Sequence, residues 1–237
     1  MTADRWTRAV RHQLGLGRLL PLGEARDGAW IAERAAEAVL GRAARGAPGV
    51  RLDALRIALA DPEDTGEPAV PAPPSALPPG PLRVTAEIAA TGARPLPATA
   101  SLVREALATA AARQVGLAVT EVDLKVTGLL EEEPEAEPET ESAGPPPAER
   151  VEGGDEGRVA AAALEVPGVL RLTGTLGHPV HIEERQAGAA LPHRHVRLEV
   201  AVAAEHRAGD VARAVRTAVG AVLPDHPTVA VVVSALG

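Results

Sequence analysis

The sequence predicts an α+β fold built from two similar units, each a three-stranded sheet with helices on one face. Two observations carry this prediction. The same order of apolar patterns occurs on both sides of an acidic, proline-rich segment, and in each copy stretches of strand-like alternation flank one stretch of helix-like spacing. We therefore expect each unit to run helix, strand, strand, helix, strand.

Four regions follow along the chain. We expect an N-terminal amphipathic helix and connector at residues 1–26, a first unit at 27–130, an acidic disordered linker at 131–156 and a second, shorter unit at 157–237. A basic amphipathic helix is typical both of a segment that covers a core and of one that docks on a membrane surface or a partner. Its basic side carries Arg5, Arg8, Arg11 and His12, and its apolar side Trp6, Ala9, Val10 and Leu14.

In the first unit we expect a helix from Gly28, because Ile31, Ala35 and Val39 fall on one side at helical spacing. The Pro48-Gly49 pair ends this helix, since proline disfavours the helical region for the residue before it. The remaining predicted elements are a strand at 48–59, a proline-rich loop at 61–81, a strand at 81–91, a helix at 102–113 and a strand at 121–130.

The second unit repeats that order with shorter loops. We expect the third strand of each sheet to pair with the first. We also expect the second unit to dock against the first, because a core of alanine and valine buries little apolar area by itself. The predicted elements are a helix at 156–164, strands at 167–178 and 195–205, a helix at 211–222 and a strand at 228–237.

Composition excludes several function classes. The chain has no cysteine, which excludes disulfides, thiolate zinc sites and a cysteine nucleophile. It has no signal-peptide h-region and no run of 18 apolar residues, so we expect a cytoplasmic protein without direct membrane insertion. Of the formal charge of −8, residues 131–156 hold 11 acidic residues and one basic residue, which leaves 23 basic and 21 acidic residues elsewhere. That near-neutral remainder predicts no nucleic-acid partner.

Histidine is the only reactive residue type that clusters. His178, His181, His193 and His195 fall in one stretch with carboxylates nearby, which is a pattern that can ligate zinc or another divalent metal. A pH-sensitive loop is a second interpretation, and a solvated loop between two strands, without metal, is the one we favour.

Enzyme motifs are missing from the sequence: there is no GxSxG elbow, no Walker loop and no complete dinucleotide loop. The carboxylates of the folded part are spread along helix and strand faces, where we expect them to be solvated. We therefore predict no enzymatic activity, no catalytic residues and no cofactor.

One family resembles this pattern. The stretches IAERAAEAV, PGVRLDALRI, RVTAEIAA and GLAVTEVDLKVTGLL, together with PGVLRL, HVRLEVAVA, DVARAVRTAV and TVAVVVSAL in the second copy, resemble the alkaline-shock-protein (Gls-type) family of Gram-positive bacteria. The resemblance covers about 190 residues, in the order that an internal repeat requires. This chain departs from the common single-unit form because it is a tandem with long inserted loops.

The resemblance implies a non-catalytic cytoplasmic protein that is linked to envelope stress and held at the inner face of the membrane by a separate anchor protein. We therefore predict an interaction or scaffold protein that associates with itself as a homo-oligomer or binds a membrane-anchored protein partner through its sheet edges. A KH-like nucleic-acid binder is the alternative, disfavoured by the charge balance and by the missing GxxG loop. A divalent-metal binder, through the histidines, is the other alternative.

Overall fold

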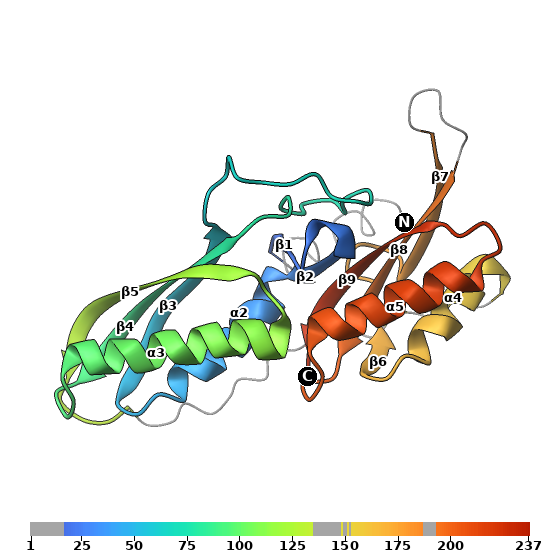
Figure 1. Cartoon of the computed structure of the whole chain (residues 1–237). Coiled ribbons are helices and arrows are strands. Elements are labelled where there is room, and N and C mark those ends of the chain that lie inside the picture. Colours follow the sequence, from blue (N-terminus) through green and yellow to red (C-terminus); the bar gives the residue numbers. More distant parts are fainter. Residues whose placement is uncertain (1–16, 135–147, 149–150, 152, 187–192) are drawn as a thin grey trace, which may run out of the picture.

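The computed structural model describes residues 17–134, 148, 151, 153–186 and 193–237, and in this part of the chain it is a mixed α+β fold with two sheets and four α-helices. Figure 1 shows the two sheets side by side, one with α2 and α3 and the other with α4 and α5. The predicted helix in residues 1–16 and most of the predicted linker lie outside the described residues.

The smaller sheet has the strand order β3-β4-β5, with β3 and β4 antiparallel and β4 and β5 parallel. Each strand matches a predicted one in position. The helices α2 and α3 pack against it, and α3 continues into a π-helical turn at Ala111–Val115. The elements are α2 (Glu33–Arg45), β3 (Val50–Leu59), β4 (Leu82–Thr91), α3 (Leu96–Ala110) and β5 (Val119–Leu130).

The predicted pairing of the third strand with the first is wrong, because β5 pairs with β4. Strands joined by a single crossover helix are usually neighbours in the sheet, and α3 makes that crossover. The outer side of β3 is also occupied, since the guanidinium of Arg18 donates a hydrogen bond to the carbonyl oxygen of Ile57 at 2.8 Å. In the larger sheet, likewise, β9 pairs with β8 and not with β6.

The larger sheet has six strands in the order β1-β2-β9-β8-β6, and β7 also pairs with β8. The predicted strand at 167–178 is too long, because β6 ends at Leu172, and β7, which was not predicted, lies in the stretch where a loop was expected. The elements are β1 (Leu19–Pro21), a 3₁₀ turn (Ala25–Asp27), β2 (Ala29–Ala32), α4 (Gly154–Leu164), β6 (Val169–Leu172), β7 (Val180–Arg185), β8 (His193–Val202), α5 (Ala208–Val222) and β9 (Thr228–Leu236).

The prediction of a helix from Gly28 is wrong over its first turn, because Ala29–Ala32 form β2 and α2 begins at Glu33. β2 lies parallel to β9, with Trp30 opposite Val232, and antiparallel to β1. A strand partner about 200 residues away outweighs a local helical pattern, because the pairing also buries Trp30 and Ile31 completely.

The halves of the chain share one hydrophobic core, so the prediction that they dock is confirmed. β2 and the start of α2 lie against β9, and Arg207 at the start of α5 donates a hydrogen bond to the carbonyl of Ala112 at 2.8 Å. Most of the core is alanine, valine and leucine, and Trp30 is the largest fully buried side chain. The one aromatic side chain of the described core therefore lies on β2, the strand that pairs with β9.

The proline-rich loop at 61–81 closes the edge of the larger sheet beyond β1. Ala76 forms an isolated parallel bridge with Leu19, and the amide of Leu77 donates to the Leu19 carbonyl at 2.8 Å. The indole Nε1 of Trp30 donates to the Leu77 carbonyl at 3.3 Å. The prolines of this loop have no backbone N–H group to donate to another strand, and this is one way in which proteins protect a sheet edge from further pairing.

Candidate functional site

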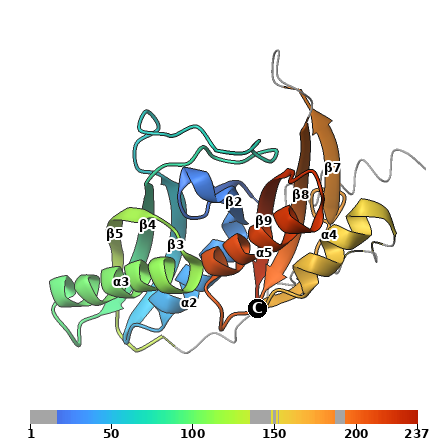
Figure 2. The same cartoon turned by 45° about the vertical axis from the view of Figure 1, so that its right-hand side comes forward.

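The strand that follows the crossover helix has a different neighbour in each sheet. β9 has β8 on one side and β2 on the other, and the amide of Val231 donates to the carbonyl of Gly28 at 3.0 Å. β5 has β4 on one side and, among the described residues, no strand on the other. In Figure 2, β5 is the outermost strand of the smaller sheet.

The side chains of β9 are more deeply buried than those of β5, because β9 has a strand on each side. Val231, Val232 and Val233 of β9 have no exposed surface, so both faces of that strand are covered. On β5, by contrast, 38% of Val126 and 70% of Leu129 are exposed. An edge strand with exposed apolar side chains and unpaired backbone groups is a template for another strand.

The two strands occupy the same register position in their sheets, which makes the comparison direct. Each has one extra residue after a valine: Thr127 between Val126 and Gly128, and Ser234 between Val233 and Ala235. Both hydroxyls lie within hydrogen-bond distance of a carbonyl of the strand beside them, Thr127 of Ile88 at 3.0 Å and Ser234 of Val200 at 3.3 Å, although Thr127 makes a shorter bond, of 2.6 Å, to the Asp53 carboxylate. Counting back from these bulges, Leu124 of β5 corresponds to Val231 of β9.

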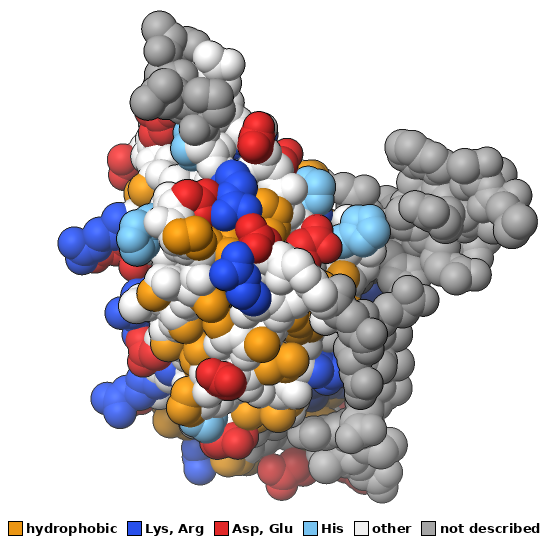
Figure 3. Space-filling model, turned by 90° about the vertical axis from the view of Figure 1, so that its right-hand side faces the viewer, with side chains coloured by type: hydrophobic (Ala, Val, Ile, Leu, Met, Phe, Trp, Pro, Cys, Tyr) orange, Lys and Arg blue, Asp and Glu red, His pale blue; other side chains and the backbone are white. Residues whose placement is uncertain are grey.

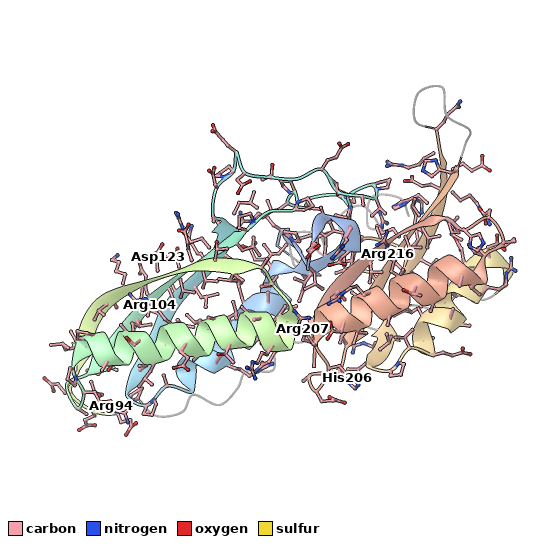
Figure 4. All side chains as sticks on the ribbon, in the orientation of Figure 1. Arg94, Arg104, Asp123, His206, Arg207 and Arg216 are labelled. Carbon is pink, nitrogen blue, oxygen red and sulfur yellow. The ribbon has the colours of Figure 1, made fainter. Side chains whose placement is uncertain are left out.

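Charged side chains cover the face of the smaller sheet that lies away from the helices. Lys125 of β5 pairs with Glu87 of β4 at 3.0 Å. Arg83 of β4 contacts Glu121 and, at 3.6 Å, Asp123. These pairs are solvent-exposed and contribute little to stability. On the outer strand they involve two acidic residues, Glu121 and Asp123, followed by the basic Lys125. In Figure 4, Asp123 and Arg104 lie on opposite sides of the β5 ribbon.

Other edges in the described residues are shorter or occupied. β3 carries a register shift at Asp53, and Arg18 covers one of its carbonyls. β6 has four residues, and the amide of Ala148 donates to its Leu172 carbonyl at 3.2 Å. β5 has 12 residues, and although Arg104 covers its Val122 carbonyl, it offers the longest edge without a strand partner in this part of the chain.

The four histidines of the alternative metal-site interpretation lie on different elements. His178 lies exposed in the turn before β7, whereas His181 is on β7 and His193 and His195 are on β8. Among the described residues no three histidine, aspartate or glutamate side chains are placed to hold a metal ion. Figure 3, which shows the end of the molecule with α4 and β7, shows histidine side chains separated by other residues.

The expectation of exposed loop histidines is wrong for His195, which is in a strand and only 4% exposed. Its Nδ1 lies 2.8 Å from the hydroxyl of Thr228. Burial, with a smaller contribution from the charge of Arg185, lowers the pKa of His195 to about 4. The ring is therefore neutral near neutral pH and acts as a buried polar group of the core.

The expectation of solvated carboxylates is wrong for Glu199, which is fully buried in the middle of β8. Its two oxygens accept hydrogen bonds from the backbone amides of Thr175 and Leu176, at 2.7 and 2.8 Å, in the turn between β6 and β7. Burial raises the pKa of Glu199 to about 7, although these amides act in the opposite direction. The sequence signal was a glutamate at the centre of an apolar strand.

Two of the surface cavities in the described residues are lined by charged side chains. One, of about 330 Å³, lies beside the start of α2 and contains the Arg18–Glu33 ion pair. Burial raises the pKa of Glu33, but the hydrogen bonds from Arg18 outweigh it and the net pKa is lowered. The other, of about 610 Å³, lies at the carboxyl end of β4 and is lined by Thr91, Arg94 and Thr99.

Comparisons with protein-family models and with curated protein sequences find no match to this chain. None of the helices in the described residues combines the length and the apolar character that crossing a bilayer requires. The feature that most clearly offers a binding surface is therefore the open edge of β5.

Proposed function

We propose that this chain is a non-catalytic interaction protein that binds its partner by strand addition at the open edge of β5. The observation that carries the proposal is the contrast between two strands at the same register position. β9 has its outer edge filled by β2, and β5 presents the same edge with Val126 and Leu129 exposed. Strand addition uses backbone hydrogen bonds for affinity and alternate side chains for specificity.

We further propose that the two halves descend from one duplicated αββαβ unit. Support comes from the matching strand orders, β3-β4-β5 and β6-β8-β9, each with a parallel final pair. Equivalent bulges at Thr127 and Ser234 also support it, since bulges are kept as specific features within related folds. On this proposal β2 is an addition that fills an edge which the ancestral unit left open.

The family resemblance supplies the cellular part of the proposal. It implies a cytoplasmic protein that accumulates at the inner face of the membrane through an anchored partner and takes part in the envelope stress response. In this proposal the partner, or a second copy of the chain, contributes the strand that β5 lacks. The acidic segment at 131–156 follows β5 directly in the sequence.

A photo-crosslinking residue in place of Val126 tests this proposal in the cells that make the protein. We expect covalent adducts with its own chain or with a membrane-anchored protein, because Val126 lies at the open edge of the sheet. The control carries the same residue in place of Ala214, which is exposed on α5. Equal adducts at both positions, or none at Val126, would contradict strand addition at β5.

A further inference from the structure

The backbone of β5 is regular over a short central segment, and this segment decides how another strand can join it. Register shifts occur on both sides, at Thr120 and at Thr127, and residues 121–126 lie between them in continuous register with β4. The Nε of Arg104 donates to the carbonyl of Val122 at 3.3 Å, which places that carbonyl on the outer side of the strand. Because strand residues alternate, the backbone groups of Leu124 and Val126 point outward too.

An added antiparallel strand must therefore pair its own outward residues with Val122, Leu124 and Val126. If that strand is β5 of a second copy, the two-fold axis restricts the choice to a few registers. An axis at Asp123 would place two aspartates opposite each other, and an axis at Lys125 would place two lysines opposite each other. Like charges directly opposite are destabilising, so both registers are disfavoured.

We propose that β5 pairs antiparallel with β5 of a second copy about a two-fold axis at Leu124, so that two smaller sheets form one continuous sheet. This inference rests on the proposed function and names the partner. In this register each Lys125 faces Asp123 of the other copy, and Val122 faces Val126. All three outward residues of the regular segment make backbone pairs once Arg104 releases the carbonyl of Val122, and both opposite charges meet.

Charged residues of β4 extend the charge complementarity of this register. Glu87 of β4 already pairs with Lys125, and Arg83 contacts Asp123. The joined sheet would carry a row of alternating acid and base from Glu87 through Lys125 to Asp123 of the second copy. On the helix side, the partly exposed Val122, Leu124 and Val126 would form a continuous apolar strip with their counterparts.

Charge reversal gives a test on the full-length chain, with sedimentation velocity over a range of concentrations as the measurement. Lys125→Asp and Asp123→Lys each place like charges opposite at two symmetric points, so each should raise the dimer dissociation constant at least about tenfold. The double variant Asp123→Lys with Lys125→Asp exchanges the two charges and should restore dimerisation. Mixing the two single variants should yield a heterodimer, because all four opposed charges are then complementary.

Glu121→Lys is the matched control, because in this register Glu121 faces the uncharged Thr127 of the second copy. It makes the same charge change two residues away from Asp123 and should leave dimerisation nearly unchanged. Circular dichroism of each variant establishes that the fold is intact. Lys125 is also the only lysine of the chain, so an amine-reactive crosslinker should link Lys125 to Lys125 between copies of the wild type.

Three results would overturn the inference: a wild type that stays monomeric, dimers that ignore the charge reversals, or a double variant that does not recover. A monomeric wild type that still forms adducts with another protein at Val126 would leave the proposed function standing and remove only the second copy as partner. Absence of all adducts at Val126 would remove the proposed function itself.

Discussion

The larger and the smaller sheet differ chiefly in what lies beside the last strand. β9 is enclosed by β2 and β8, whereas β5 has a strand beside it only in β4 among the residues that the structure describes. The side chains reflect this difference, because Val231, Val232 and Val233 form an unbroken apolar run and the equivalent stretch of β5 contains Lys125. The comparison teaches that a segment from outside a unit, here Ala29–Ala32, can convert an open edge into a core strand.

Among the variants that we propose, removal of the Trp30 side chain on β2 should change the free energy of unfolding most. Trp30→Ala is expected to lower the free energy of unfolding by about 3–5 kcal/mol, because the side chain is fully buried and leaves a cavity. Chemical denaturation measures this loss. Leu129→Ala on the open edge is the control, and its effect should stay within about 0.5 kcal/mol since most of Leu129 is exposed. Similar losses for both variants would contradict the contrast between the two edges.

The two sheets also carry a glutamate at the same register position, Glu87 in the smaller sheet and Glu199 in the larger one. Glu199 in β8 is fully buried and accepts hydrogen bonds from two backbone amides, and Glu87 in β4 is partly exposed beside Lys125. The folded-state pKa of Glu199, about 7, lies above its ordinary value of 4.5, so the folded protein binds a proton more tightly than the unfolded chain. Stability therefore falls as pH rises from 4.5 through 7.

Glu199→Gln should abolish that fall. The difference in unfolding free energy between this variant and the wild type should shift in favour of the variant by about 3 kcal/mol as pH rises from acidic to mildly alkaline values. Denaturation curves at several pH values would measure this shift. Glu87→Gln, at the matching exposed position, should differ little from the wild type over this range. His195 acts in the opposite sense, since its lowered pKa of about 4 costs stability as pH falls below 6.5. Parallel pH profiles for Glu199→Gln and the wild type would refute the assignment.

Much of the fold could be predicted from local patterns. The Pro-Gly pairs at Pro48 and Pro167 mark the corners between helix and strand. The crossover helices and the closing strands are recognisable by the spacing of their apolar residues. β2 could not be found this way, because its four residues continue a helical pattern and its partner lies far along the chain. The pairing of the third strand was mispredicted for the same reason, since periodicity identifies strands but not their neighbours.

The candidate site was less accessible to sequence reasoning. The alternation of β5 indicated one exposed face, yet only the sheet order shows that its outer edge is open. The histidines were identified by their proximity in the sequence, and strand pairing separates them. The burial of Glu199 depends on the turn at Thr175 and Leu176, which carries no recognisable motif.

The central claim is that the outer edge of β5 is open whereas that of β9 is covered by β2. Amide hydrogen exchange tests it most directly, because one experiment measures the protection of both strands. In dilute protein the outward amides of Leu124 and Val126 in β5 should exchange rapidly, whereas the equivalent Val231 and Val233 in β9 should be protected by β2. Raising the protein concentration should slow exchange in β5 alone. Equal protection of both strands in dilute protein, or rapid exchange along β9, would contradict the account.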